Sequence, residues 1–192
     1  MLIELDSPDE VAAVRAAVVS AALPSVVDVV PAARTVLVRC SPGAGVAAVR
    51  DLVADLPVDV ATPPAGRTVT IPVIYDGPDL ALVASTAGVS EDEVVALHTG
   101  AVYTVAFCGF APGFGYLTGL PDALRQPRLD TPRQSVPAGS VAVAGQFTGA
   151  YPRATPGGWR LLGRTEVVLF DASRSSPALF EPGDRVRFEV AS

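Results

Sequence analysis

The residue types that could carry chemistry gather in one stretch of the chain, residues 109–165. This stretch holds ten of the seventeen glycines and seven of the eighteen prolines, which together specify turns and leave peptide groups accessible. It carries six arginines against two aspartates, a local charge of +4 in a chain whose formal net charge is −6. A cationic stretch on an acidic protein indicates an anionic ligand or an acidic partner surface. The alternative is a set of ordinary surface ion pairs, each contributing about 0–1 kcal/mol.

Arg128 and Arg133 are the candidate anion-binding residues of this stretch. A guanidinium is planar and offers parallel donors, so it can hold a carboxylate or a phosphate through two hydrogen bonds at once. The two arginines stand on either side of Asp130 in the sequence PRLDTPR. Pairing with Asp130 is therefore the alternative interpretation, and the sequence leaves both roles open.

Aromatic and polar side chains beside glycines are the other candidate binding residues. Phe110, Phe114 and Tyr116 alternate with proline and glycine, and they could form the apolar wall of a pocket or equally part of a barrel core. Gln146 and Thr148 lie next to glycines in AGQFTG, where a backbone could approach a ligand. With Arg128, these five residues form the predicted substrate-binding set. Trp159, which follows a Pro-Gly-Gly run, is expected to be a structural plug or an interface anchor.

His98 is the single histidine of the chain, and the pattern places it near the end of a helix. An unperturbed imidazole titrates near a pKa of ~6.5, so His98 could act as a general base or a substrate ligand. A histidine in the last turn of a helix also interacts favourably with the helix dipole and needs no further role. One histidine cannot build a multi-histidine metal site, and no metal site is expected.

Composition excludes several classes of function. The chain has no lysine, so it lacks a P-loop lysine, a Schiff-base lysine and a biotinyl-lysine; ATP or biotin chemistry would have to involve another polypeptide. An isoelectric point near 4.7 opposes binding to nucleic acid. Cys40 and Cys108 have no CxxC neighbour, which argues against a disulfide scaffold or a cysteine-rich metal site.

Residues 1–62 are predicted to form a compact α+β domain with a ferredoxin-like layout. The expected order is a strand over 2–5, a helix over 8–20, a hairpin of strands 26–30 and 35–40, a helix over 44–54 and a strand over 58–61. The helix over 8–20 opens with a capping box, Ser7-Pro8-Asp9-Glu10, with proline at its first position. A Pro- and Gly-containing linker over 61–66 marks the domain boundary.

Residues 66–192 are predicted to form a mainly β domain that carries the site. Strands are expected over 68–75, 101–107, 166–170 and 185–190, and helices over 79–85 and 90–98, the second opened by the capping box Ser90-Glu91-Asp92-Glu93. Many short strands separated by turns favour a barrel. Composition alone does not distinguish a barrel from a sandwich.

Several ordered blocks give the chain a family resemblance. GFAPGFGYL, VPAGSVAVAG and TPGGW-L-GRT resemble the signature blocks of the allophanate hydrolase subunit 1 family, and the match runs from about Val69 to the end. That family includes the B subunit of 5-oxoprolinase, the sporulation kinase A inhibitor and one half of the carboxyltransferase region of urea carboxylase. The resemblance implies a cyclophilin-like β-barrel for residues 66–192. It also implies a functional histidine at His98, so we expect His98 to be catalytic. Arg133, whose guanidinium could hold an anion, is the second expected catalytic residue.

The resemblance implies the B subunit (subunit 1) of an ATP-dependent 5-oxoprolinase-like amidohydrolase, which opens 5-oxoproline to glutamate; this chain is expected to be inactive alone. The expected partners are a homologue of subunit 2, the C subunit, which forms a heteromer with this chain, and a third, LamB/YcsF-like polypeptide, the A subunit. Two alternatives stay open: a regulatory inhibitor that binds a sensor histidine kinase, and an allophanate hydrolase or urea carboxylase carboxyltransferase half.

The chain is expected to be a soluble cytoplasmic protein. Its first ten residues are acidic and lack the basic start of a secretory signal. The longest apolar tract, residues 11–27, is interrupted by Arg15, Ser20 and Pro24, so it falls short of the ~20 apolar residues that a membrane span requires.

Overall fold

The computed structural model describes residues 1–56 and 66–191. The chain divides into two compact units, Met1–Ala65 and Gly66–Ser192, which we call unit 1 and unit 2. Hydropathy and helix length give no membrane-spanning helix in the described ranges.

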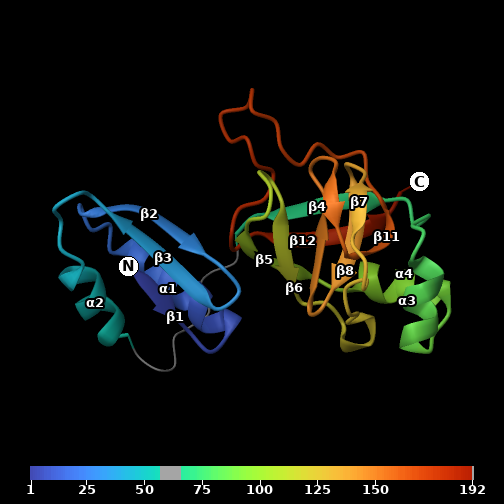
Figure 1. Cartoon of the computed structure of the whole chain (residues 1–192), viewed down its shortest axis with the longest axis horizontal. Helices are drawn as coiled ribbons and strands as arrows, with labels where there is room; N and C mark the ends of the chain where they lie inside the picture. Colours follow the sequence, from blue (N-terminus) through green and yellow to red (C-terminus); the bar gives the residue numbers. More distant parts are fainter. Residues whose placement is uncertain (57–65, 192) are drawn as a thin grey trace. The chain divides into compact units, whose positions relative to one another are not determined.

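Unit 1 is a three-stranded antiparallel sheet with two helices (Figure 1). The elements are β1 (Leu2–Glu4), α1 (Pro8–Ser20), β2 (Val26–Pro31), β3 (Thr35–Cys40) and α2 (Ala47–Ala54), and the strand order is β1-β3-β2. This reproduces the predicted order of the first five elements. The strand predicted over 58–61, which the ferredoxin-like layout also requires, lies outside the described residues.

The start of α1 and the core of unit 1 follow directly from the sequence. The Ser7 side chain accepts a hydrogen bond from the Glu10 backbone N–H at 3.2 Å, which satisfies one free donor of the first turn. The Glu10 side chain accepts from the backbone N–H of Asp6 at 2.9 Å and not from that of Ser7, so the predicted capping box is only half formed. The buried side chains Val11, Val14 and Val18 recur at helical spacing and join the core with Val36 and Val38 of β3. The helical repeat of 3.6 residues in α1 and the two-residue alternation in β3 therefore direct apolar side chains into the same core.

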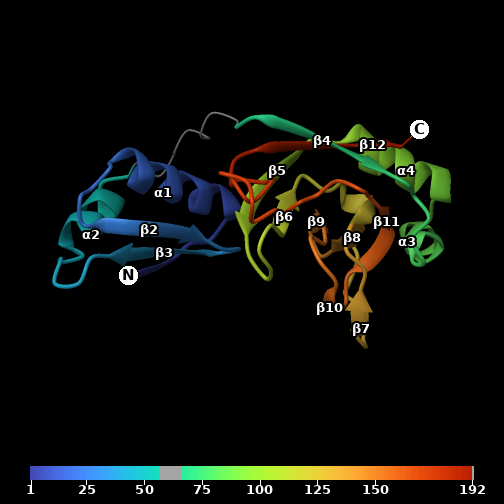
Figure 2. The same ribbon diagram turned by 90° about the horizontal axis from the view of Figure 1, so that it is seen from above.

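Unit 2 is built on a seven-stranded sheet in the order β11-β8-β9-β6-β5-β12-β4. Its strands are β4 (Thr68–Val73), β5 (Tyr103–Cys108), β6 (Gly115–Thr118), β8 (Ser140–Ala144), β9 (Phe147–Ala150), β11 (Arg160–Arg164) and β12 (Arg185–Val190). Neighbours are antiparallel except β12 and β4, which are parallel. A separate ribbon of β7 (Arg133–Val136) and β10 (Thr155–Gly157) projects from this sheet (Figure 2).

The two edges of this sheet meet, so unit 2 is a nearly closed barrel. Ile74, which follows β4, and Arg164, at the end of β11, exchange two backbone hydrogen bonds of 2.8 and 2.9 Å. Gly163 permits this contact, because a Cβ at that position would lie 2.2 Å from the carbonyl oxygen of Ile74. The barrel predicted from the short strands is therefore present in this nearly closed form.

Two helices lie together at one end of unit 2 (Figure 1). They are α3 (Leu80–Ala87), which ends at Gly88 with φ of 71°, and α4 (Glu91–Gly100), and a 3₁₀ turn, η1 (Asp122–Leu124), packs near them. The predicted capping box is present, since Ser90 and Glu93 each accept a hydrogen bond from the other's backbone N–H.

The prediction of a strand over 166–170 is wrong. Only an isolated bridge between Phe170 and Ala178 forms there. Val167 and Leu169 face the core while Val168 and Phe170 are exposed, so the segment alternates like a strand. The alternation reflects packing of an extended loop against the barrel and not pairing within the sheet.

Candidate functional site

The structure distributes the eight predicted site residues over four places in unit 2. Phe110, Phe114, Tyr116 and Arg128 line one small pocket. Arg133 lines a second, larger groove. His98 and Thr148 contact each other in the barrel core, and Gln146 is exposed at the turn between β8 and β9.

The first place, which we call the aromatic pocket, is a cavity of about 90 Å³. Five aromatic side chains, two glycines and one arginine line it: Phe110, Phe114, Tyr116, Tyr151, Trp159, Gly157, Gly158 and Arg128. The sequence-based binding set did not include Tyr151 or Trp159. Trp159 directly follows Gly157-Gly158, as Phe114 and Tyr116 directly follow glycines, whereas Tyr151 follows Ala150 and lacks this signal.

A tight turn between β5 and β6 positions the two phenylalanines. The backbone N–H of Gly109 donates to the carbonyl of Phe114 at 3.1 Å, and the N–H of Phe114 donates to the carbonyl of Ala111 at 3.0 Å. Phe110 adopts φ of 67°, a left-handed conformation that costs a non-glycine residue about 1–2 kcal/mol. As a result Phe110 is 59% exposed at the rim, whereas Phe114 is 1% exposed on the floor.

Phe114 is the centre of the aromatic contacts. Its ring meets those of Tyr116, Tyr151 and Trp159 edge to face, with centroids 5.0, 5.2 and 5.3 Å apart. Phe110 meets Phe114 in the same way at 5.4 Å. Pairs of this geometry contribute about 0.5–1.5 kcal/mol each beyond the area that they bury, so the floor of the aromatic pocket is fixed before any ligand arrives.

Arg128 supplies the charge of the aromatic pocket. Among the described residues no carboxylate lies within 4.0 Å of its guanidinium. Burial raises the pKa of Tyr116 and of Tyr151, and the positive charge of Arg128 opposes that rise at both hydroxyls. The pocket therefore combines neutral phenol hydroxyls with a guanidinium that no acidic side chain balances.

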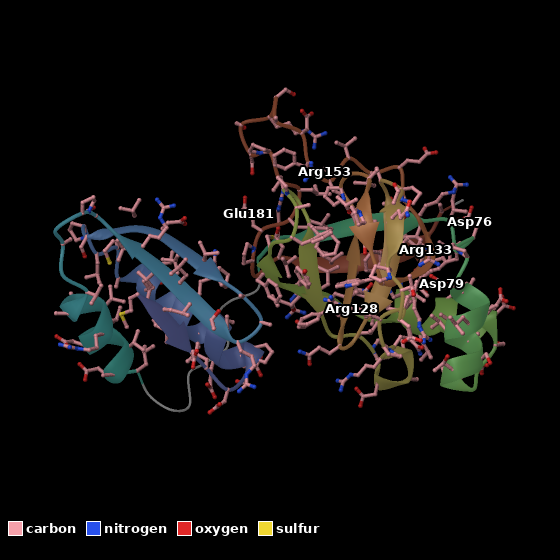
Figure 3. All side chains as sticks on the ribbon, in the orientation of Figure 1. Asp76, Asp79, Arg128, Arg133, Arg153 and Glu181 are labelled. Carbon is pink, nitrogen blue, oxygen red and sulfur yellow. The ribbon has the colours of Figure 1, made fainter. Side chains whose placement is uncertain are left out.

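Arg133 lies in a groove of about 390 Å³ that also contains Asp76, Ser135, Ser140 and Arg164. Its guanidinium donates to both carboxylate oxygens of Asp79 at 2.7 and 2.9 Å, as the adjacent side chains in Figure 3 illustrate. Pairing with Asp130, the alternative drawn from the sequence, is wrong: the partner is Asp79, 54 residues away. Arg164 is likewise paired with Asp76 at 2.9 Å, so both arginine charges of the groove are balanced.

The Asp79–Arg133 pair braces the wall of the aromatic pocket. Asp79 is buried and also accepts a hydrogen bond from the backbone N–H of Leu161 at 2.7 Å. Arg133 donates to the carbonyl of Trp159 at 3.4 Å. The pair thus ties the start of α3 to the segment that presents the Trp159 ring, which gives Arg133 a positioning role.

His98 is fully buried in the barrel core, stacked on Phe188 with ring centroids 4.5 Å apart. Thr148 donates its hydroxyl hydrogen to the carbonyl of Ala142 at 3.0 Å, so at 2.9 Å it must accept from Nε2–H of His98. Nδ1 then accepts from the Tyr75 hydroxyl at 2.7 Å. We call these three side chains, His98, Thr148 and Tyr75, the His98 cluster.

Burial holds His98 in its neutral form. It lowers the pKa of the imidazole to about 3, because the surrounding core cannot solvate a cation. Both ring nitrogens are engaged and no part of the ring reaches the surface. In this structure neither His98 nor Thr148 has access to a substrate, and the geometry of His98 is that of a structural hub.

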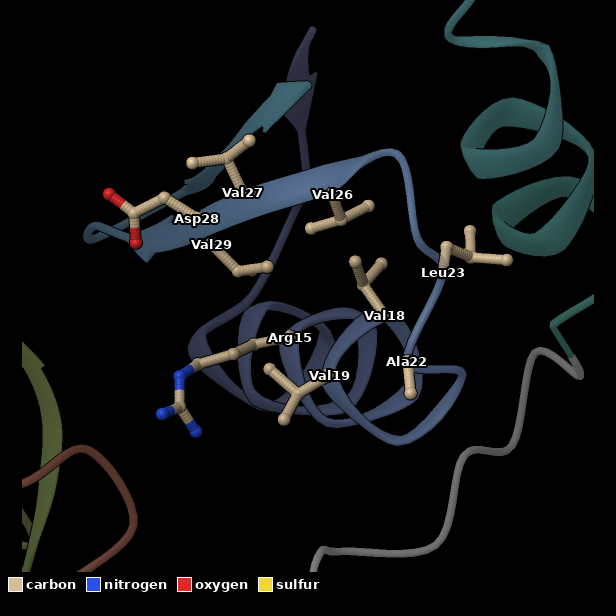
Figure 4. Close-up of a pocket in the computed structure, with 9 residues that line it drawn as sticks. All are labelled: Arg15, Val18, Val19, Ala22, Leu23, Val26, Val27, Asp28 and Val29. Atoms are coloured by element: carbon tan, nitrogen blue, oxygen red, sulfur yellow. The ribbon is translucent and has the colours of Figure 1, made fainter. Parts of the chain in front are cut away.

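A further hollow of about 450 Å³ lies on unit 1 between α1 and β2 (Figure 4). Most of its lining is aliphatic, with Arg15 and Asp28 as its charged residues. It contains none of the predicted site residues. In the described part of the chain, no three His, Cys, Asp or Glu side chains come together as metal ligands would.

Comparison with known proteins gives consistent relatives. The family model described as carboxyltransferase domain, subdomain C and D, matches residues 2–180. The B subunit of 5-oxoprolinase from Escherichia coli O157:H7 is 46% identical over 171 residues, which cover 86% of this chain and 78% of that protein. The corresponding 5-oxoprolinase B subunit from Bacillus subtilis is 47% identical over 125 residues, 64% of this chain and 52% of that protein.

Solved structures agree. The crystal structure of TTHA0988 is 40% identical in sequence, with a TM-score of 0.85. The match covers all of this chain and 40% of the TTHA0988 chain. PH0987 from Pyrococcus horikoshii matches 99% of this chain and 90% of its own, with a TM-score of 0.64 and 34% identity. The Kluyveromyces lactis urea carboxylase, at 17% identity and a TM-score of 0.76, covers all of this chain and 21% of its own, and shares the fold. Because the family model spans nearly the whole sequence, the chain belongs to the carboxyltransferase domain family of subdomains C and D.

Proposed function

We propose that this chain is the B subunit of an ATP-dependent 5-oxoprolinase-like complex, which hydrolyses the cyclic amide of 5-oxoproline to give glutamate. The observation that carries the proposal is the 46% identity to a 5-oxoprolinase B subunit over 86% of this chain. The aromatic pocket supports it, because it offers one unbalanced cation beside apolar rings, a combination suited to a small carboxylate.

The complex would contain two further polypeptides, a subunit 2 homologue bound to this chain and a LamB/YcsF-like third polypeptide, in the cytoplasm. ATP would be bound with the help of those partners. This chain has no lysine, and the two arginines of its larger groove are already paired with aspartates, so that groove offers no unpaired cation to a triphosphate. The chain alone would accordingly be inactive.

We also propose a fold for each of the two units. Unit 1 would be a ferredoxin-like domain and unit 2 a cyclophilin-like barrel. The strand order β1-β3-β2 and the nearly closed sheet of unit 2 support these assignments. The aromatic pocket would contact the substrate, and His98 and Arg133 would hold the barrel and the pocket wall in place.

The experiment is reconstitution. The chain is purified alone, with its subunit 2 homologue, and with both partners, and 5-oxoproline-dependent ATP hydrolysis is assayed in each case. We expect co-purification with the subunit 2 homologue and activity only in the full mixture. Full activity from the isolated chain would contradict the shared assembly. No co-purification, together with tight binding to a sensor histidine kinase, would favour the inhibitor function instead, and biotin-dependent carboxyl transfer would favour a urea carboxylase-like function.

A further inference from the structure

We propose that the aromatic pocket is a binding site for a small ring-bearing carboxylate, with Arg128 pairing with the carboxylate and the aromatic floor contacting the ring. The inference rests on the proposed function, since 5-oxoproline is a five-membered lactam with one carboxylate. It goes further by naming the residue that would recognise the substrate and the wall against which the ring would lie.

Arg128 differs from the other five arginines of residues 109–165: four of them are engaged by other side chains, and the fifth, the exposed Arg153, does not line the aromatic pocket. Arg125, Arg133 and Arg164 are each paired with an aspartate within 2.9 Å. Arg160 donates to the side chains of Gln126 and Thr86. Arg128 lines a cavity, and no ion pair to it forms in residues 1–56 and 66–191. An exposed guanidinium facing a cavity without an acidic neighbour attracts an anion.

The remaining walls suit a carboxylate on a small apolar ring. No Asp or Glu lines the aromatic pocket, so nothing there repels an anion. The hydroxyls of Tyr116 and Tyr151 can donate a hydrogen bond, and the raised pKa of each keeps it protonated at neutral pH. The buried rings of Phe114 and Trp159 form an apolar floor that is already packed.

Size separates the small carboxylate from a nucleotide. Pockets for drug-sized ligands occupy roughly 300–1,000 Å³, whereas the aromatic pocket measures about 90 Å³. The larger groove of about 390 Å³ has the volume but offers only paired arginines. Of these two cavities in unit 2, the one lined by an arginine without an ion pair is the small one, which fits a small ligand.

The strained rim points to a ligand as well. Phe110 is held at φ of 67° with 59% of its surface exposed, and strained backbone is concentrated at ligand sites. Its ring stands edge to face with both Phe114 and Tyr151. A ligand seated beside Arg128 would cover part of this exposed ring.

Trp159 allows a direct test, because it is the only tryptophan of the chain and lines the pocket. Its fluorescence is titrated with 5-oxoproline in the full chain and in Arg128→Ala and Arg153→Ala. Arg153 is the matched control: it is exposed in the same stretch, has no ion pair among the described residues and does not line the aromatic pocket. The ring without a carboxylate, 2-pyrrolidinone, is the control ligand.

We expect a saturable change with 5-oxoproline in the wild type and Arg153→Ala, and at least tenfold weaker binding for Arg128→Ala and for 2-pyrrolidinone. In the reconstituted complex, Arg128→Ala should raise KM for 5-oxoproline by a similar factor with a smaller change in kcat. Equal binding to the wild type and Arg128→Ala, or no saturable change in the wild type, would overturn the inference.

The same measurements separate the inference from the proposed function. Arg128-dependent binding without any 5-oxoproline-dependent ATP hydrolysis by the complex would leave the pocket assignment standing and remove the proposed function. An active complex whose KM for 5-oxoproline is unchanged by Arg128→Ala would support the proposed function and remove the pocket assignment. Loss of binding to the subunit 2 homologue in Arg128→Ala, with 5-oxoproline binding intact, would show that the guanidinium meets a partner carboxylate and would overturn the small-molecule assignment.

Discussion

The aromatic pocket and the His98 cluster both place a nitrogen-bearing side chain among aromatic rings, yet they differ in every property that permits binding. His98 is fully buried, and each ring nitrogen has a hydrogen-bond partner in Tyr75 or Thr148. Arg128 is exposed, lines a cavity and has no carboxylate near it in the described chain. A side chain can bind a ligand or react with it only when its polar atoms are accessible and have no other hydrogen-bond partner.

This difference separates residues that stabilise the fold of unit 2 from a residue that binds a ligand. The free energy tied to His98 and to the Asp79–Arg133 pair should appear in the stability of unit 2. The free energy tied to Arg128 should appear in ligand binding. Substitutions in the two regions therefore test whether stability and ligand binding depend on different residues.

The largest loss of stability is expected for His98→Ala. The substitution removes a buried ring stacked on Phe188 and leaves the hydroxyls of Tyr75 and Thr148 without a partner, which together should cost about 3–5 kcal/mol of unfolding free energy. Urea denaturation measures it, with Arg153→Ala as the surface control. If His98→Ala unfolds within about 1 kcal/mol of the wild type, the histidine is not the structural hub described above.

Asp79→Asn should have the next largest effect, about 2–3 kcal/mol, because it leaves the largely buried guanidinium of Arg133 without its charge partner. The matched control is Asp76→Asn, whose pair with Arg164 is about half exposed on both sides and should contribute less than about 1 kcal/mol. Thermal unfolding compares the two. Equal destabilisation by both substitutions would mean that burial does not distinguish the pairs.

Acidification should destabilise the wild type by about 2 kcal/mol between pH 7 and pH 5 through His98 alone. The folded pKa is about 3 and the unfolded value is ~6.5, so in this window the unfolded chain binds the proton and the folded chain does not. The contribution is complete above the unfolded pKa and is lost as the pH falls toward the folded one. Denaturation of wild type and His98→Gln at both pH values isolates it; parallel losses in the two proteins would refute it.

Arg128→Ala should change stability by less than about 0.5 kcal/mol, because an exposed side chain without an ion pair makes little net contribution to folding. Urea denaturation beside the Trp159 titration gives both quantities for one variant. A stability loss above about 1 kcal/mol, matching the loss in binding, would place Arg128 with the structural residues and remove the contrast between the two regions.

Local signals in the sequence were enough for much of the fold. The capping residues Ser7 and Ser90 marked the starts of α1 and α4, and the helix predicted over 8–20 is present as Pro8–Ser20. The pairing of strands was not local. Residues 166–170 alternate like a strand but pack as a loop, because only the three-dimensional arrangement decides whether a partner strand is at hand.

The location of the candidate site could be predicted from the sequence, but the ion-pair partners of its residues could not. The stretch of glycine, proline and arginine does contain the aromatic pocket, and four of the predicted residues line it. The partner of Arg133 is Asp79, which no nearby pattern identifies, because ion pairs join residues that only the fold brings together. The burial of His98 was likewise hidden, since the end of a helix can face solvent or the core.

The most direct test of the contrast is a pH titration of the His98 imidazole by NMR, with and without 5-oxoproline. His98 is the only histidine of the chain, so its ring signals need no assignment by mutation. We expect one neutral Nε2–H tautomer whose signals stay constant from about pH 5 to pH 8 and do not respond to 5-oxoproline, while the fluorescence of Trp159 does respond. A midpoint near the unperturbed value of ~6.5, or a shift of the imidazole signals on adding 5-oxoproline, would contradict it.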